Sequence, residues 1–463
     1  MNENSHTAQE ICTFANRYRK RDGGQVVSMH YDQFTVKARL HWDDGGRDWL
    51  IRFTFSGRSS FIDEKVQNEA VAMKFVALNT PIPIPRVITY GTAADNPTGL
   101  GPFIIMTWVE GRKMSDVLWN TRGRSVEETR AKREILYGQM ADILLELWNL
   151  NFDRIGSLVQ TEITRTFSAN RRPSSQGISE LSRVWDLSDH IEPSRIYHSA
   201  VEYIYSLLEL QSIRLERQRT IMSDTASYRE QYAARHLMKA IALSFVSRTD
   251  NYGPFKLFAE GLRPEHVLVD DSLQVTGVTN WEFCYSGPVQ FAGSMPDWLL
   301  PLAPHIYIKQ RGLHAFLESY VTQGNSFLEV LQKKEDGRGY NSDRLSVRMR
   351  QSIQDNSAWF NLACRSVTGL DIIYWNLIDE WCWGPRTSIT ERVYVVTNTG
   401  LHKSRDSTAQ PNNSGGGGAA KKDSRKSFSE MKSPSIFETV LGYLRRGAYR
   451  RGKSGMVRDY SAR

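Results

Sequence analysis

The sequence predicts an α+β fold in which a small antiparallel sheet precedes a long helical region. Three observations support this. Short segments near the N-terminus alternate apolar and polar residues, as half-buried strands do. Beyond Ser125 the apolar residues recur mostly at helical spacing. The segment 397–435 carries Ser, Lys, Asn and a run of Gly with almost no large apolar residues, which is typical of a disordered linker. It precedes a short expected helix at 436–444 and a basic end, and 397–463 is expected to be a disordered linker and tail.

The sheet begins with a hairpin. The segment 34–42 reads FTVKARLHW, and 49–55 alternates in the same way, so both predict strands with one buried face. Asp43-Asp44-Gly45-Gly46 between them is typical of a hairpin turn. A helix is predicted over 61–79 and ends before Pro81, and two further strands are expected at 86–90 and 103–109.

Helices dominate the rest of the chain. Two segments of this region are expected to differ. The segment 161–189 is polar and irregular, which predicts a loop. Two short strands joined by a tight turn are predicted at Val267–Val269 and Val275–Thr279. Helices are predicted at Ser125–Leu150, 197–222, 226–246, 313–331 and 345–370.

Composition excludes several classes of protein. The chain has 463 residues, 40% of them hydrophobic, and its four cysteines form no C-x-x-C pair, so neither a zinc site nor a disulfide framework is expected. No signal pattern or membrane span is read in the sequence, and a cytoplasmic location is therefore expected. From Leu401 onward the chain has 14 Lys and Arg and five Asp and Glu, a formal charge of +9. The formal charge of the whole chain is +8, so residues 1–400 together carry −1. Nucleic-acid binding is thus expected only if the basic tail provides it.

Several stretches match one protein family. The central one, 259–270, reads AEGLRPEHVLVD and is followed by VTNWE at 278–282. It resembles the catalytic segment of the aminoglycoside phosphotransferase family, in particular a fungal-type branch. The stretches KVQNEAVAMKF (65–75), IPIPRVITYG (82–91) and NFDRIGSL (151–158) resemble the same branch.

This resemblance implies a two-lobed protein-kinase-like fold and ATP-dependent transfer of phosphate to a small-molecule hydroxyl. It divides the chain into a lead-in, an antiparallel-sheet N-lobe, a helical C-lobe and a disordered basic tail. The expected parts are 1–23, 24–110, 111–396 and 397–463, with a catalytic-type hairpin at 257–283 and a helical insertion at 195–247.

Three positions that carry chemistry in the family are substituted. Phosphoryl transfer needs a carboxylate near the attacking hydroxyl and oxygen ligands for Mg²⁺. The resemblance places these roles at Gly261, His266 and Asn280. Glycine accepts no proton, histidine is a poor ligand for a hard cation, and an amide removes one charge from the metal site. ATP remains the implied cofactor, but the substitutions argue against bound Mg²⁺.

Two acidic neighbours are candidate substitutes for the missing base. Glu260 and Glu265 flank the substituted positions, and a shift of one residue in the loop would reverse the direction of a side chain. A loop or core role for His266 is the alternative to a role as metal ligand.

The resemblance also assigns nucleotide contacts in the N-lobe. Arg52 and Glu69 match the strand and helix residues whose ion pair positions phosphates, although a purely structural ion pair is equally open. The backbone near Thr107 and Val109 matches the edge that binds an adenine ring. The expected nucleotide-covering loop at 29–33 lacks glycine, which makes close approach to phosphate harder.

We therefore interpret the chain as an aminoglycoside-phosphotransferase-like pseudokinase that binds a small-molecule ligand or a protein partner. One alternative is a residually active phosphotransferase that uses Glu260 or Glu265 as its base. Another is a protein-interaction scaffold that binds no nucleotide.

Overall fold

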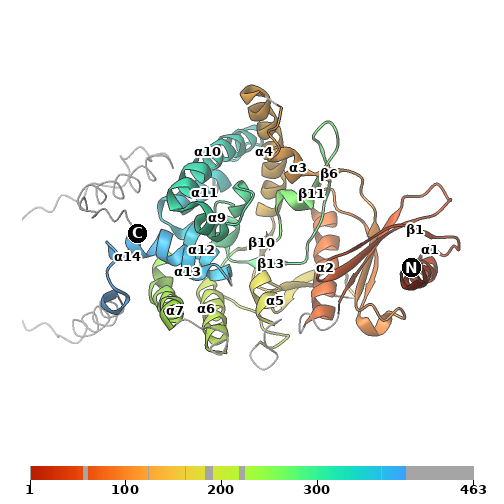
Figure 1. Ribbon diagram of the computed structural model, residues 1–463, viewed down its shortest axis with the longest axis horizontal. Helices are drawn as coiled ribbons and strands as arrows, with labels where there is room; N and C mark the ends of the chain where they lie inside the picture. Colours follow the sequence, from red (N-terminus) through yellow and green to blue (C-terminus); the bar gives the residue numbers. More distant parts are fainter. Residues whose placement is uncertain are drawn as a thin grey trace, which may run out of the picture.

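Two lobes, one mainly sheet and one mainly helix, make up the described part of the chain (Figure 1). The computed structural model describes residues 2–392 apart from 56–60, 124, 162, 183–190, 218–224 and 367. The predicted α+β class, with an antiparallel-sheet N-lobe and a large helical C-lobe, is confirmed. The disordered tail expected at 397–463 lies outside the described residues.

The N-lobe sheet has five antiparallel strands in the order β1-β2-β3-β5-β4. Its central strands are those that the alternating sequence pattern predicted, because a buried face demands a strict period of two. The strands are β1 (Gln25–Tyr31), β2 (Thr35–His41), β3 (Trp49–Thr54), β4 (Val87–Gly91) and β5 (Phe103–Thr107).

The two faces of this sheet are covered by different helices. Helix α1 (Asn2–Arg19) lies against one face, where Ile11 and Phe14 pack with Ile51, Phe53 and other inward side chains of the strands. Helix α2 (Ile62–Asn79) lies on the opposite side of the sheet, toward the C-lobe (Figure 1). The segment expected as a lead-in is therefore part of the N-lobe core.

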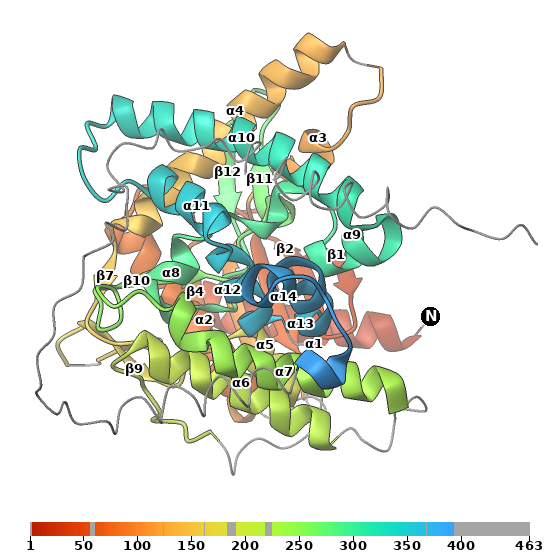
Figure 2. The ribbon, with the colours of Figure 1, turned by 90° about the vertical axis from the view of Figure 1, so that its left-hand side faces the viewer.

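The C-lobe is built mostly from helices. The capping box of Ser125 and Glu128 fixes the start of the long helix α4 (Val126–Trp148). Helices α6 (Ala200–Arg217) and α7 (Thr225–Phe245) occupy the expected insertion and lie side by side (Figure 2). The other α-helices are α3 (Met114–Leu118), α5 (Gln176–Ser182), α8 (Val289–Ala292), α9 (Pro304–Arg311), α10 (Leu313–Gly337), α11 (Leu345–Gln354), α12 (Ser357–Arg365), α13 (Leu370–Ile373) and α14 (Asp379–Trp383).

Small sheets carry the central loops of the C-lobe. Strands β11 (Val267–Val269) and β12 (Val275–Val278) form the predicted hairpin, and β11 also pairs with β6 (Arg112–Lys113). A second sheet has the order β13-β10-β7, and a third consists of β8 and β9. These strands are β7 (Asn151–Phe152), β8 (Ser157–Gln160), β9 (Phe167–Arg171), β10 (Phe255–Ala259) and β13 (Cys284–Gly287).

Three local predictions were wrong. The loop expected at 29–33 is largely the end of β1, an edge strand whose partly exposed residues give no clear alternation. The loop expected at 161–189 contains β9 and the described helix α5. The single helix expected over 345–370 is interrupted at Asn356, whose φ of 62° is incompatible with a continuing helix.

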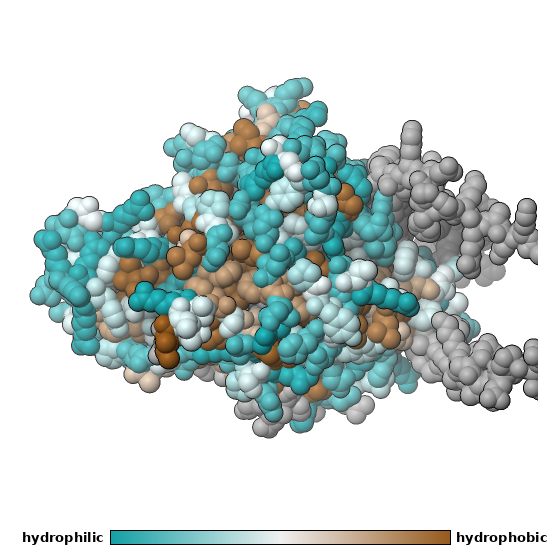
Figure 3. All heavy atoms as spheres, turned by 180° about the vertical axis from the view of Figure 1, so that it is seen from behind, coloured by the Kyte–Doolittle hydropathy of each residue, from teal (hydrophilic) through white to brown (hydrophobic). Residues whose placement is uncertain are grey.

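The outer surface follows the usual division of side chains. Seen from behind, hydrophilic residues cover most of the face, and hydrophobic ones gather in a band toward its middle (Figure 3). No helix among the described residues is long and apolar enough to cross a membrane.

Candidate functional site

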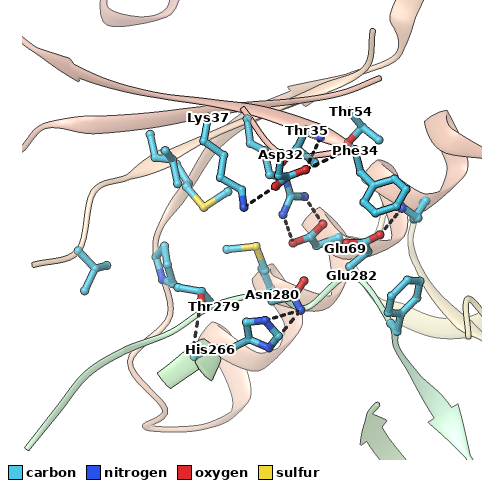
Figure 4. A pocket seen from close by; sticks show the side chains of 18 of the residues that line it. Asp32, Phe34, Thr35, Lys37, Thr54, Glu69, His266, Thr279, Asn280 and Glu282 are labelled. Atoms are coloured by element: carbon cyan, nitrogen blue, oxygen red, sulfur yellow. Dashed lines mark hydrogen bonds and ion pairs between the residues drawn. The ribbon is translucent and has the colours of Figure 1, made fainter. Parts of the chain in front are cut away.

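A cleft of about 530 Å³ lies where the N-lobe sheet faces the hairpin of β11 and β12. Strands β2 and β3, helix α2 and the segment Thr107–Val109 supply one side of the cleft. His266, Thr279, Asn280 and Glu282 supply the other side (Figure 4). Most of the residues predicted from the sequence therefore come together at one place.

Arg52 and Glu69 form the ion pair that the resemblance implied. Nη1 of Arg52 donates a hydrogen bond to Oε1 of Glu69 at 3.0 Å, and Nη2 donates to Oε2. The two residues are only 9% and 1% exposed, yet both line the cleft. A buried, two-pronged pair of this kind holds the guanidinium in one orientation. It fixes α2 against β3 whether or not a phosphate is present.

Two further ion pairs in the cleft were missed by the sequence reasoning. Nζ of Lys37 lies 3.2 Å from Oδ2 of Asp32, and Lys65 pairs with Glu282. Asp32 also accepts hydrogen bonds from Thr35 and from the Phe34 N–H. Burial acts to raise the pKa of Asp32, but these hydrogen bonds outweigh it and lower the pKa to about 2. The sequence D-x-x-T is the signal that would have indicated this turn.

The three substituted positions contact one another directly. Nδ1 of His266 lies 2.7 Å from the carbonyl oxygen of Gly261. Nδ2 of Asn280 lies 3.2 Å and 3.3 Å from Nδ1 and Nε2 of the same ring. Figure 4 shows the imidazole and the amide side by side at the floor of the cleft.

These contacts define the state of the His266 ring. A carbonyl only accepts, so Nδ1–H must donate to Gly261, and Nε2 is then the acceptor for the amide of Asn280. Burial lowers the pKa of His266, which favours this neutral form. The side chains at the positions that the resemblance assigns to Mg²⁺ thus hydrogen-bond to each other and to the backbone of Gly261.

Gly261 leaves little room for the missing carboxylate. A Cβ atom built there would lie 3.2 Å from Nδ2 and 3.3 Å from the backbone oxygen of Asn280. Asn280 itself has a φ of 62°, a left-handed conformation that Asn tolerates better than most residues. A side chain at 261 would require Asn280 to shift by a few tenths of an ångström.

The two candidate bases do not line the cleft. The side chain of Glu260 is 4% exposed, accepts the Gln176 N–H at 2.9 Å, and lies 3.6 Å from Nη1 of Arg365 in a separate small cavity. Burial raises the pKa of Glu260. Glu265 lies 3.7 Å from Nε of Arg263 and is likewise absent from the lining of the cleft. The structure therefore places neither carboxylate beside Gly261, His266 and Asn280 in the cleft.

The segment Thr107–Val109, which the resemblance assigns to an adenine ring, has one backbone N–H without a partner among the described residues. The Thr107 N–H donates to Arg86 and the Trp108 N–H donates to Asp48. The Val109 N–H has no hydrogen-bond partner in the described part of the chain, and Val109 lines the cleft. This edge can accept a planar ligand through backbone contacts alone.

Each cation that lines the cleft already has a carboxylate partner within the protein. Its three lining cations, Lys37, Arg52 and Lys65, are each paired with a carboxylate. Four lining carboxylates, the three partners and Glu180, give the described lining a formal charge of −1. No group of three or more His, Cys, Asp or Glu side chains that suits a metal ion occurs among the described residues. The residues present do not fit Mg²⁺, and a nucleotide triphosphate would have to compete for the cations.

Comparison with known proteins gives remote relatives. No protein-family model matches the chain. The chain is 28% identical over 114 residues to "Altered inheritance of mitochondria protein 9, mitochondrial" of Scheffersomyces stipitis, and 27% identical over 138 residues to the protein of that name in Komagataella phaffii. These matches cover 24% and 29% of this chain but only 18% and 22% of the relatives' own length.

Similar solved structures are small-molecule kinases and phosphotransferases. A Plasmodium vivax ethanolamine kinase is 10% identical with a TM-score of 0.40 and covers 83% of each chain. A macrolide 2'-phosphotransferase type I is 12% identical with a TM-score of 0.34, covering 74% of this chain and 95% of its own. At these scores the fold assignment rests on the sheet order and lobes described above.

The expected cytoplasmic location is wrong by this comparison. Four relatives match, and every one of them is named as a mitochondrial protein. The expectation was based on the lack of a signal pattern and of a membrane span in the sequence. Neither observation bears on import into an organelle.

Proposed function

We propose that this chain is a member of the aminoglycoside phosphotransferase family whose cleft binds a ligand without ordinary Mg²⁺-dependent phosphotransfer. The observation that carries the proposal is the closed contact of Gly261, His266 and Asn280. A neutral imidazole fills the position of one metal ligand, and the amide at 280 donates to it. Catalysis would need a carboxylate and two oxygen ligands at these same positions.

The cleft still favours a ligand of nucleoside size. Its volume of about 530 Å³ is within the range of small-molecule sites. The Val109 N–H offers a hydrogen bond to a flat heterocycle, and Leu50, Met73 and Met106 supply apolar surface around it. ATP is therefore the first ligand to test, with binding expected to be independent of Mg²⁺.

A thermal-shift measurement on the full chain tests the proposal. A ligand that binds only the folded state raises its stability by about 2.7 kcal/mol at a hundredfold excess over Kd. We expect a rise in Tm with ATP that is the same with and without Mg²⁺. A rise that requires Mg²⁺ would contradict the proposal and favour a residually active enzyme. No rise in either condition would favour a scaffold that binds no nucleotide.

A restored variant provides the matched control. His266→Asn combined with Asn280→Asp returns two oxygen ligands to the hairpin and breaks the imidazole contact. In this variant the Tm rise with ATP should become larger when Mg²⁺ is added. Equal shifts for the variant and the wild type in Mg²⁺ would show that the two residues do not control the metal site.

A mitochondrial location belongs to the same proposal. It is supported by the names of the four relatives. Fractionation of cells that express the full-length tagged chain tests it, and recovery only in the soluble cytosolic fraction would contradict it.

A further inference from the structure

A second pocket lies in the C-lobe, between α6, α7, α9 and the segment 368–376 that includes α13. Its volume is about 610 Å³, and it shares no lining residue with the cleft between the lobes. Figure 2 shows α6 and α7 side by side below α13. The pocket is thus separate from the site of the proposed function.

The pocket contains a deeply buried cation. Arg235 of α7 is only 4% exposed. Its Nε donates to the carbonyl oxygen of Gln211 at 3.1 Å, and its Nη1 donates to that of Gln231 at 2.8 Å. Among the described residues no carboxylate forms an ion pair with Arg235, and its Nη2 has no hydrogen-bond partner. Burial lowers the pKa of Arg235 to about 10, so the guanidinium is still charged at neutral pH.

The buried charge of Arg235 is only partly balanced, because Asp371 acts on it electrostatically without forming an ion pair with it. Removing a cation from water costs several kcal/mol, and carbonyl dipoles offset only part of that cost. An anion that enters the pocket would supply the missing partner. The unused Nη2 edge of a guanidinium suits the oxygen atoms of phosphate or carboxylate.

The other charged residues of the pocket favour an anion. Arg214 and Lys309 also line it, and Asp371 is the single carboxylate among its described lining residues. Arg235 and Lys309 against Asp371 give these three side chains a formal charge of +1. A phosphate group carries about −1.5 to −2 at pH 7. We propose that this pocket binds a small molecule or ion of the phosphate class, with Arg235 as its central contact.

Thermal unfolding of the full chain with inorganic phosphate tests the proposal. Ionic strength is held constant with sodium chloride, so that general screening does not change. Phosphate should raise the Tm of the wild type. Arg235→Met should weaken phosphate affinity by about tenfold or more, and in phosphate-free buffer it should be at least as stable as the wild type because the buried charge is gone. Arg229→Met, a change to an exposed arginine of the same helix, should keep the full response.

Two results would overturn the proposal. One is an unchanged wild-type Tm in phosphate. The other is an equal response in the wild type and in Arg235→Met, which would place the bound anion elsewhere. If Arg235→Met does not fold, Asp371→Asn provides the test. This change removes the carboxylate from the described lining, so phosphate binding should become several-fold tighter. An unchanged phosphate affinity would contradict the proposal. These readouts do not involve ATP, so they are independent of the cleft.

Discussion

At the scale of single residues, His266 is central to the proposed function. Its ring joins Gly261 and Asn280 in one hydrogen-bonded group. A family-like Asn at this position would offer an oxygen to a metal, whereas the imidazole uses both nitrogens within the protein. In the proposed function, the contacts among Gly261, His266 and Asn280 therefore add to the effect of each substitution taken alone.

The protonation of His266 leads to a prediction about pH. Its folded-state pKa is lowered by burial, below the ordinary value of about 6.5. The unfolded chain then binds more protons around and below pH 6.5, so stability should fall as the pH drops through that range. Urea unfolding at pH 7.5 and 5.5 measures this. His266→Asn should lose part of the pH dependence, while His314→Asn, at an exposed histidine, should keep it. Equal slopes for all three proteins would contradict the assignment.

At the scale of elements, α2 is the part that joins the lobes. Besides holding Arg52 through Glu69, it reaches the C-lobe through Lys65 and Glu282. Glu64 of the same helix accepts from Nε of Arg172 at 2.9 Å. Two ion pairs thus fix one N-lobe helix to two separate C-lobe segments, which limits how far the cleft can open.

The contact between Lys65 and Glu282 can be measured by a double-mutant cycle. Lys65→Met, Glu282→Gln and the combined variant are compared with the wild type by urea unfolding. We expect a coupling free energy of about 1 kcal/mol, because both side chains are partly buried, at 15% and 19% exposure. Strictly additive effects would show that the pair does not connect the lobes energetically.

The elements also show what the sequence can and cannot predict. Strand β2 was predicted because one of its faces is buried, which enforces strict alternation. Strand β3 was predicted from the same alternation in the sequence, although all of its residues except Leu50 are buried. Strand β1 was missed because it lies at the sheet edge, with exposed residues at both ends. The burial of α1 against the sheet was also missed, since its amphipathic pattern does not specify a partner.

At the scale of the molecule, the two-lobed arrangement was expected from the family resemblance, and the structure has it. Six of the nine predicted site residues line the cleft, and Glu260 and Glu265 do not. Glu260 follows β10 and points toward Arg365 and away from the cleft. It lies in a turn closed by the hydrogen bond from the Leu262 N–H to the Ala259 carbonyl, where strand alternation no longer sets the direction of a side chain. Only the structure could decide between the two directions.

Turnover of ATP by the full chain tests the central claim most directly. Release or transfer of the labelled γ-phosphate is followed with Mg²⁺ present and with protein in excess over nucleotide. The account predicts no turnover above that of a Glu282→Gln control. Three of the four described carboxylates that line the cleft are held in ion pairs, and the fourth, Glu180 of α5, accepts a hydrogen bond from Gln176 of the same helix. Mg²⁺-dependent turnover that is lost in Glu260→Gln or Glu265→Gln would contradict it.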